Sequence, residues 1–146
     1  MIQDLSAIGT KFTIYCIPTF PQGITLTLLP GETDPLTSAE MQLATWKTGV
    51  NGDLILYRQA SGFEITLGTI AGTEDDMAME ILFEANRIGK NKIAYHDTIT
   101  LVAQYPDMTR VLTNGAIVKG TPLINISADG QKKGRNWTFV FEGRVS

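Results

Sequence analysis

The fold is decided by the stretch TITLVAQY, residues 98–105, in which every second side chain is apolar: Ile99, Leu101, Ala103 and Tyr105. Successive side chains of a β-strand point to opposite faces, so this alternation predicts a strand with one buried and one solvated face. The stretch FEITL, residues 63–67, has the same pattern, with Glu64 and Thr66 on its polar face. Both stretches indicate an antiparallel sheet that is covered on one side only.

Outward from these two stretches, the same alternation and the residue composition predict further strands. They are expected at residues 12–16, 24–28, 41–48, 53–57 and 136–142. Asp107 and the pair Asn114-Gly115 are predicted to be turns, with Val111 and Ile117 in the strands around them. Threonine, isoleucine and valine make 39 of the 146 residues β-branched, and such residues favour sheets over helices.

One helix is expected, from Thr73 to about Ile88. Thr73 is a good N-cap, and the acidic residues 74–76 suit the positive end of the helix dipole, with Asp76 close to a capping-box position. The predicted apolar face consists of Met77, Ile81, Leu82, Ala85 and Ile88. Gly89 is expected to end the helix in a left-handed conformation. The predicted fold is mainly β, an antiparallel β-sandwich or barrel with one flanking α-helix, in a single domain over residues 1–146.

Composition excludes several classes of function. Fifteen acidic and 12 basic residues give a net charge of -3, which argues against a nucleic-acid binder that holds phosphates with a basic surface. The single cysteine and single histidine exclude a disulfide framework, a multi-thiolate zinc site and a two-histidine metal motif. No apolar run is long enough to span a bilayer, and the first five residues lack the pattern of a signal peptide, so no membrane partner is expected.

Catalytic motifs are weak. His96 and Asp97 are adjacent in sequence, which on a strand directs them to opposite faces, so we interpret His96 as a surface histidine. Cys16 falls on an apolar strand face and is predicted to be an inert buried thiol. The acidic run 74–76 is better explained by a helix N-terminus than by a cation site. We therefore predict no enzyme activity, no metal site and no cofactor.

Two other patterns also have structural interpretations. The segment Gly49–Gly52 lacks the lysine of a phosphate-binding loop. The basic cluster Lys132, Lys133 and Arg135 follows Asp129-Gly130, which predicts a solvated hairpin tip rather than a nucleic-acid contact.

Three segments carry a resemblance to a known family. The first runs from Gly49-Val50-Asn51-Gly52-Asp53-Leu54 to Gly62-Phe63-Glu64-Ile65-Thr66-Leu67, and the second from Ala71-Gly72-Thr73-Glu74-Asp75-Asp76 to Asn86-Arg87. The third runs from Leu112-Thr113-Asn114-Gly115-Ala116-Ile117 to Trp137-Thr138-Phe139-Val140-Phe141-Glu142. In order and spacing they resemble the tail-tube structural proteins of contractile-tail bacteriophages, over about residues 41–142.

The resemblance implies a virion structural protein that forms stacked, six-fold rings around the DNA channel of a phage tail. Its expected partners are further copies of itself, sheath, tape-measure and baseplate proteins, and DNA only in transit through the lumen. Assembly is expected in the host cytoplasm. Threonine, serine and glutamine on the lumen face would form a polar wall, and the negative charge would repel phosphates. A related alternative is a tube-like initiator or terminal ring at the baseplate or tail end.

A different class of function stays open, a small β-sandwich module that binds a ligand or receptor. Exposed Tyr57, Tyr95 or Trp46 would then stack on the ligand. The irregular segment from Gly31 to Asn51 bears on the choice, because large apolar residues there need a surface to cover them. We predict that Leu36, Met41 and Trp46 contact an adjacent subunit; the alternative is that they cover their own core.

Overall fold

The computed structural model describes residues 6, 8–27, 29–30 and 34–145. Leu28, the predicted end of a strand, and residues 31–33, in a predicted turn, lie outside this part of the chain. Within it, the strands are β1 (Lys11–Ile17), β2 (Phe20–Leu26), β3 (Leu36–Ser38), β4 (Ala44–Thr48), β5 (Leu54–Arg58), β6 (Phe63–Thr69), β7 (Thr98–Gln104), β8 (Thr109–Gly120) and β9 (Arg135–Arg144). The helix α1 spans Glu74–Asn86, between β6 and β7. The predicted fold class is confirmed.

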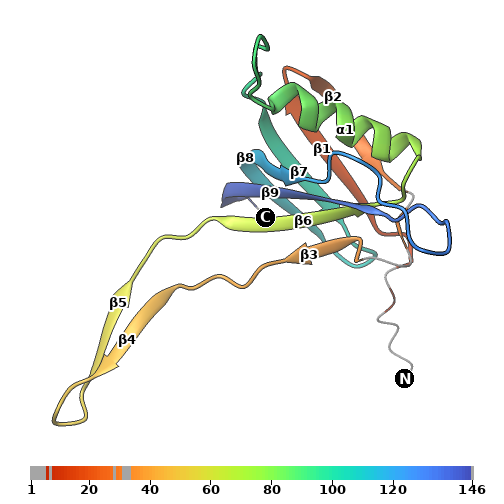
Figure 1. Ribbon diagram of the computed structural model, residues 1–146. Coiled ribbons are helices and arrows are strands. Elements are labelled where there is room, and N and C mark those ends of the chain that lie inside the picture. Colours follow the sequence, from red (N-terminus) through yellow and green to blue (C-terminus); the bar gives the residue numbers. More distant parts are fainter. Residues whose placement is uncertain (1–5, 7, 28, 31–33, 146) are drawn as a thin grey trace.

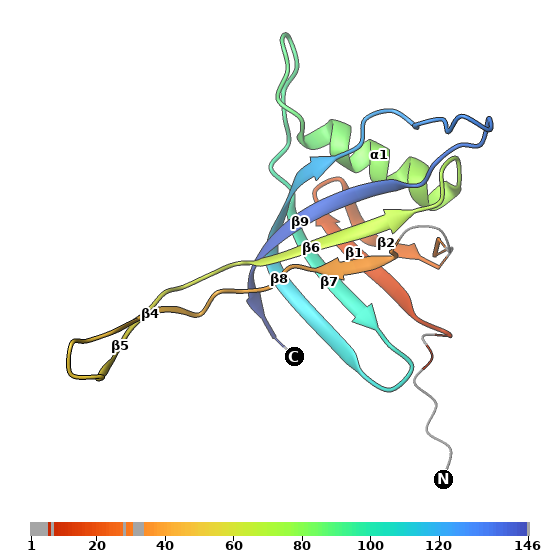
Figure 2. The ribbon, with the colours of Figure 1, turned by 60° about the horizontal axis from the view of Figure 1, so that its bottom comes forward.

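Seven strands form one antiparallel sheet in the order β2-β1-β7-β8-β9-β6-β3, and β4 pairs only with β5. The sheet is strongly curved, so that β3, β6 and β9 cross over β1, β2 and β7 (Figures 1 and 2). The edges of the sheet are β2 and the three-residue strand β3. Both edges leave backbone groups that no described strand pairs.

The core lies on one face of this sheet. It gathers the alternating apolar side chains that the sequence predicted, among them Ile99 and Leu101 on β7 and Trp137, Phe139 and Phe141 on β9. Helix α1 packs against β2 and β8 and adds Met79 and Leu82, both fully buried. The fold therefore follows from one apolar sheet face that a single helix helps to cover.

The pair Asn114-Gly115 does not form the predicted turn. β8 runs through it without a break, and Asn114 takes a left-handed φ of 55° within a bulge, where the register against β7 shifts between Ile99 and Leu101. A bulge uses the same left-handed residue that a hairpin turn would use, which explains why the sequence signal is ambiguous. Gly115 is then required by packing, because a Cβ there would lie 2.3 Å from the Phe141 ring.

The helix is confirmed, but its predicted inward face is correct only in part: Leu82 is fully buried and Ala85 half-buried, as predicted, while the other three residues are exposed. Met77, Ile81 and Ile88 are 50%, 55% and 80% exposed, whereas the inward side of the helix carries Asp76, Met79 and Leu82. The polar residues Asp76 and Asn86 lie on the inward side because each has polar partners in the body, and this rotates the apolar stripe outward. Gly89 does not end the helix in a left-handed conformation; the helix ends at Asn86, followed by an extended Arg87.

Candidate subunit interface

The most prominent feature of the surface is an arm, defined here as residues 39–62. It projects from the base of β3 and β6 far beyond the body and ends in the two-stranded ribbon β4–β5 (Figures 1 and 2). The tip is a tight turn in which the Gly49 N–H donates to the Asp53 carbonyl at 2.8 Å and Gly52 has φ 87°. The loop Gly49–Gly52, for which the sequence excluded a phosphate site, is this turn.

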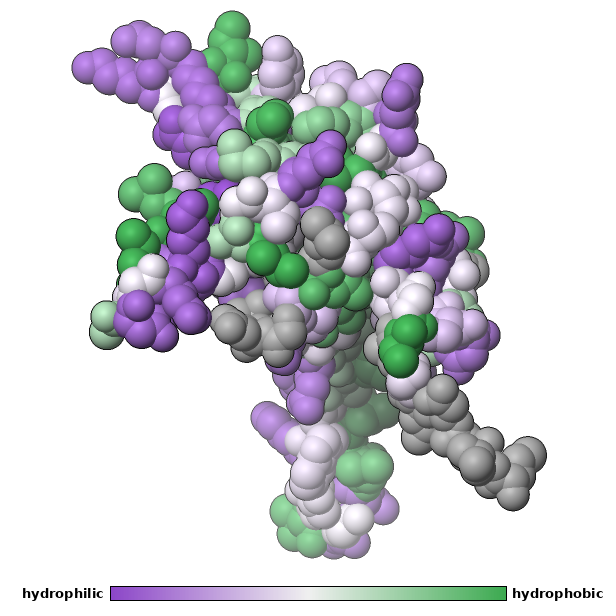
Figure 3. All heavy atoms as spheres, turned by 90° about the vertical axis from the view of Figure 1, so that its right-hand side faces the viewer, coloured by the Kyte–Doolittle hydropathy of each residue, from purple (hydrophilic) through white to green (hydrophobic). Residues whose placement is uncertain are grey.

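One face of the ribbon is apolar and uncovered. Trp46 pairs directly with Leu56, and Leu54 lies on the same face two residues along. These side chains are 68%, 48% and 68% exposed. A lone two-stranded ribbon is marginally stable in water, and uncovered apolar surface of this kind marks an interaction site. Figure 3, from another side, shows hydrophobic residues of the arm standing clear of the body.

The structure separates the three residues predicted to contact an adjacent subunit. Leu36 is on β3 opposite Leu67 and is half-buried against the protein's own core. Met41 lies half-buried in the link between β3 and β4, and Trp46 is exposed on the arm. Thus the alternative of covering its own core fits Leu36 and does not fit Trp46. That Trp46 contacts another subunit stays a prediction.

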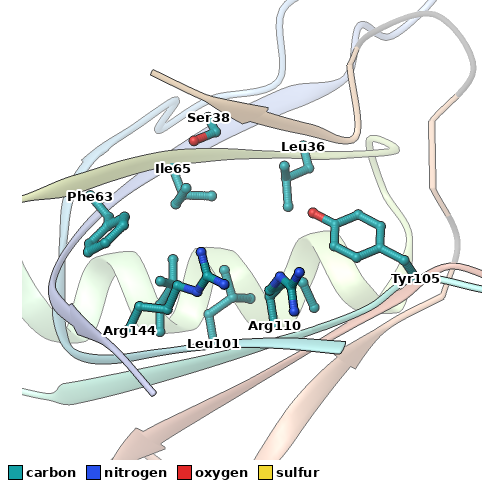
Figure 4. Close-up of a pocket in the computed structure, with 10 residues that line it drawn as sticks. Leu36, Ser38, Phe63, Ile65, Leu101, Tyr105, Arg110 and Arg144 are labelled. Carbon is teal, nitrogen blue, oxygen red and sulfur yellow. The ribbon is translucent and has the colours of Figure 1, made fainter. Parts of the chain in front are cut away.

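A cleft that sequence reasoning missed lies in the body, at the mouth of the curved sheet. Its volume is about 200 Å³. The lining is mostly apolar, from Leu36, Phe63, Ile65, Leu101 and Leu112, and Arg110 and Arg144 stand at its mouth (Figure 4). In the sequence, the trace of this cleft is a basic residue close to one terminus of each of two strands, since Arg110 is the second residue of β8 and Arg144 is the last of β9.

The opposite face of the sheet is solvated and rich in hydroxyl groups. Its exposed or half-buried threonines include Thr13, Thr25, Thr66, Thr98, Thr100 and Thr113. Lys11 is an exposed cation on this face, and Glu64 and Glu142 are exposed anions. Among the described residues of this face, the exposed charges are of both signs.

Arg135 contradicts the prediction of a solvated basic tip. It is 1% exposed and forms a two-pronged ion pair with Asp76, at 2.8 Å from Nε and 2.5 Å from Nη2. Burial by itself would raise the pKa of Asp76. Hydrogen bonds from Arg135, Thr69 and Gly72, together with the charge of Arg135, nevertheless hold this pKa below its ordinary value. The guanidinium also lies 5.1 Å from the centre of the Trp137 ring. Lys132 and Lys133 are exposed near the turn at Gly130, as predicted.

The Asp97 carboxylate likewise accepts hydrogen bonds that hold the fold. It accepts from the Thr19 backbone and hydroxyl at 3.0 and 2.5 Å and from the Asn86 amide at 2.7 Å. His96 beside it is exposed, as predicted. Burial, and in second place the charge of Asp97, raises the pKa of the Cys16 thiol to about 12, so the thiol stays protonated at neutral pH.

Among the described residues no group of three or more histidine, cysteine or acidic side chains is placed to hold a metal ion. The helix in this part of the chain is too short and too polar to cross a membrane.

Comparison with known proteins shows the family of this chain. A family model described as "Tail fiber protein gp32" matches residues 3–145. The chain belongs to this family. It is therefore a phage tail protein, associated with the virion, and this confirms the phage-tail part of the resemblance. The description of the family names a tail fiber and not a tail tube. The assignment to a tail tube is therefore a proposal.

The gp32-family chain also has a similar fold among solved structures. A chain in the six-fold symmetrised cryo-EM structure of the anti-feeding prophage baseplate superimposes with a TM-score of 0.55 at 8% sequence identity. The match covers 99% of this chain and 96% of that chain, so the two share their whole fold. No curated protein matches the sequence.

Proposed function

We propose that the protein is a ring-forming structural subunit of the phage tail. Identical copies, six to a ring, would stack around the DNA channel as the tail tube or as a tube-like ring at the baseplate end. The observation that carries this proposal is the arm, whose apolar face of Trp46, Leu54 and Leu56 is not covered by the described part of its own chain.

Two further features support a ring. The open edges β2 and β3 would pair with neighbouring copies, which removes the aggregation hazard of free strand edges. The threonine-rich face would then line the channel. Its hydroxyl groups and mixed charges offer DNA few strong contacts, and the net charge of -3 on each copy disfavours phosphate binding.

The similar fold in a baseplate structure of six-fold symmetry supports the ring at the baseplate end over a position along the main tube. Sheath, tape-measure and other baseplate proteins would be its partners, and assembly would take place in the host cytoplasm. We propose no enzymatic role and no cofactor, since the buried carboxylates of Asp76 and Asp97 are engaged in hydrogen bonds that hold the fold.

Sedimentation velocity over a range of concentrations, with negative-stain microscopy, tests the proposal. Wild-type protein should form rings or short stacks. Trp46→Ala should keep the thermal unfolding midpoint and lose assembly, whereas Leu123→Ala, which truncates a 76% exposed residue on another surface, should assemble normally. A wild-type protein that stays monomeric at every concentration, with its tail partners present, contradicts the proposal.

The family description favours a second candidate, a module that binds a receptor or other ligand. Trp46 and Tyr57 on the arm and Tyr95 on the body are exposed and would supply its aromatic contacts. Such a module would be monomeric, and its melting temperature would rise with ligand. The same sedimentation experiment therefore separates the two functions.

A further inference from the structure

We propose that the tip of the arm docks into the cleft at the mouth of the curved sheet of a second copy of this chain. This inference rests on the proposed ring assembly and specifies which two surfaces meet. It commits to one occupant for the cleft, namely the turn of residues 49–54 from a neighbouring copy.

The turn at the tip carries one exposed apolar residue and one exposed acidic residue. Val50 is completely exposed, at 105% of its reference area, and Asp53 is exposed three residues later. The hydrogen bonds of Gly49 and Gly52 hold the turn in one shape, which reduces the entropy lost on docking. The Asp53 carboxylate forms no ion pair with a described residue of its own chain.

The cleft presents the complementary arrangement. Its apolar lining is exposed to solvent at the mouth, and its volume of about 200 Å³ can accept the isopropyl group of a valine. Figure 4 shows the side chains of Arg110 and Arg144 directed into the space between β6 and β8. Arg110 is exposed and forms no ion pair with a described residue. A carboxylate that enters with an apolar side chain would meet a guanidinium, which binds it in two-pronged fashion.

The arm cannot fill the cleft of its own chain, because it points away from the body (Figures 1 and 2). A contact between two unlike surfaces of identical copies is heterologous, and it yields closed rings or continuing stacks according to the rotation between copies. Docking of tip into cleft therefore explains how one chain could build a repeating assembly.

Disulfide trapping tests the contact directly. Val50→Cys and Ser38→Cys proteins, purified separately, are mixed under mild oxidation; Ser38 lines the cleft, and native Cys16 is fully buried. We expect a cross-linked heterodimer from this mixture. Leu123→Cys mixed with Ser38→Cys is the matched control and should give none, because Leu123 is also well exposed, at 76%, but lies in the segment between β8 and β9, outside the arm.

Charge exchange gives an independent test. Asp53→Arg and Arg110→Asp should each raise the concentration needed for assembly by about tenfold, and the two changes together should restore it. Both positions are exposed, so the monomer should melt as the wild type does. Normal rings from Asp53→Arg protein, without the Val50–Ser38 cross-link, overturn the docking while the ring function stands. Failure of the wild type to assemble overturns both.

Discussion

Single residues show most clearly how the fold is held in place. Asp76 and Arg135 are 59 positions apart, yet they form a buried ion pair that fixes the first turn of α1 to the start of β9. Thr69 donates to the same carboxylate at 2.7 Å, and it accepts from the Trp137 indole at 3.1 Å. The carboxylate is thus fully satisfied, which is the condition under which a buried charge is tolerated.

The first prediction concerns this pair. Asp76→Asn should lower the free energy of unfolding by about 3–5 kcal/mol at pH 7, because it leaves Arg135 buried without a counter-charge. The folded-state pKa of Asp76 lies below its ordinary value of 3.8, so the contribution is complete above that value and is lost as the pH falls further. Urea unfolding at pH 7 and pH 3 measures both effects. The Asp76→Asn protein should lack this part of the acid sensitivity, and equal acid sensitivity would contradict the assignment.

The second prediction concerns the bulge in β8. Gly115→Ala should destabilise the protein by about 1–3 kcal/mol, because the new Cβ would overlap the Phe141 ring. Gly143→Ala is the matched control, since its Cβ would meet only the Thr113 hydroxyl, at 3.8 Å. That variant should stay within about 0.5 kcal/mol of the wild type. Thermal unfolding followed by circular dichroism compares the two, and equal midpoints would show that the ring moves aside at no cost.

At the scale of elements, helix α1 is placed by polar contacts as much as by apolar ones. The Thr73 hydroxyl caps the helix by accepting from the Asp76 backbone at 3.3 Å, as predicted. The Asp76 side chain, however, accepts from Gly72 rather than completing a capping box with Thr73. At the other end the Asn86 side chain exchanges two hydrogen bonds with Asp97. These two anchors set the rotation of the helix.

The third prediction separates the two neighbours on this helix. Leu82→Ala should cost about 2–5 kcal/mol, because Leu82 is fully buried in the core. Ile81→Ala should change stability by less than about 0.5 kcal/mol, because Ile81 is 55% exposed. Denaturant titration of the two variants, under conditions in which the protein is monomeric, is the measurement. A large loss for Ile81→Ala would indicate that a partner covers this side of the helix.

At the scale of the whole molecule, the two faces of the sheet have separate tasks. One face holds the core and the helix, and the other is left to solvent and carries hydroxyl groups. The arm extends the ribbon formed by β3 and β6 well past the body (Figure 1). Because its apolar residues Trp46, Leu54 and Leu56 are exposed, the chain has apolar surface at a distance from its own core.

The fourth prediction concerns the threonine-rich face. If this face lines the channel, replacing Thr13, Thr100 and Thr113 by lysine should convert a surface that does not retain DNA into one that does. Gel-shift assays at low salt should show no binding for the wild type and binding for the triple variant, weakening steeply as salt increases. Because all three side chains point away from the core, the variant should fold. Wild-type binding at physiological salt would contradict the assignment of a weakly binding wall.

The sequence by itself determined the type of almost every element. Period-two alternation at residues 63–67 and 98–105 fixed which side chains enter the core, because a strand has only two faces. Thr73 and the acids that follow fixed the start of the helix, because capping depends on a few neighbouring residues. The exposure of His96 and the burial of Cys16 followed from the same local patterns.

Only the tertiary structure decided the features that depend on distant partners. Arg135 is indistinguishable from Lys132 and Lys133 until folding brings Asp76 beside it, and the helix could be rotated correctly only once Asp76 and Asn86 had partners in the body. The sequence predicts that Trp46 is an apolar residue in a strand, but it does not show whether another surface covers the side chain. Trp46 is exposed because β3 and β6 direct the arm away from the body. Periodicity specifies which face of an element is apolar, but which surface meets that face is set by contacts between residues far apart in the chain.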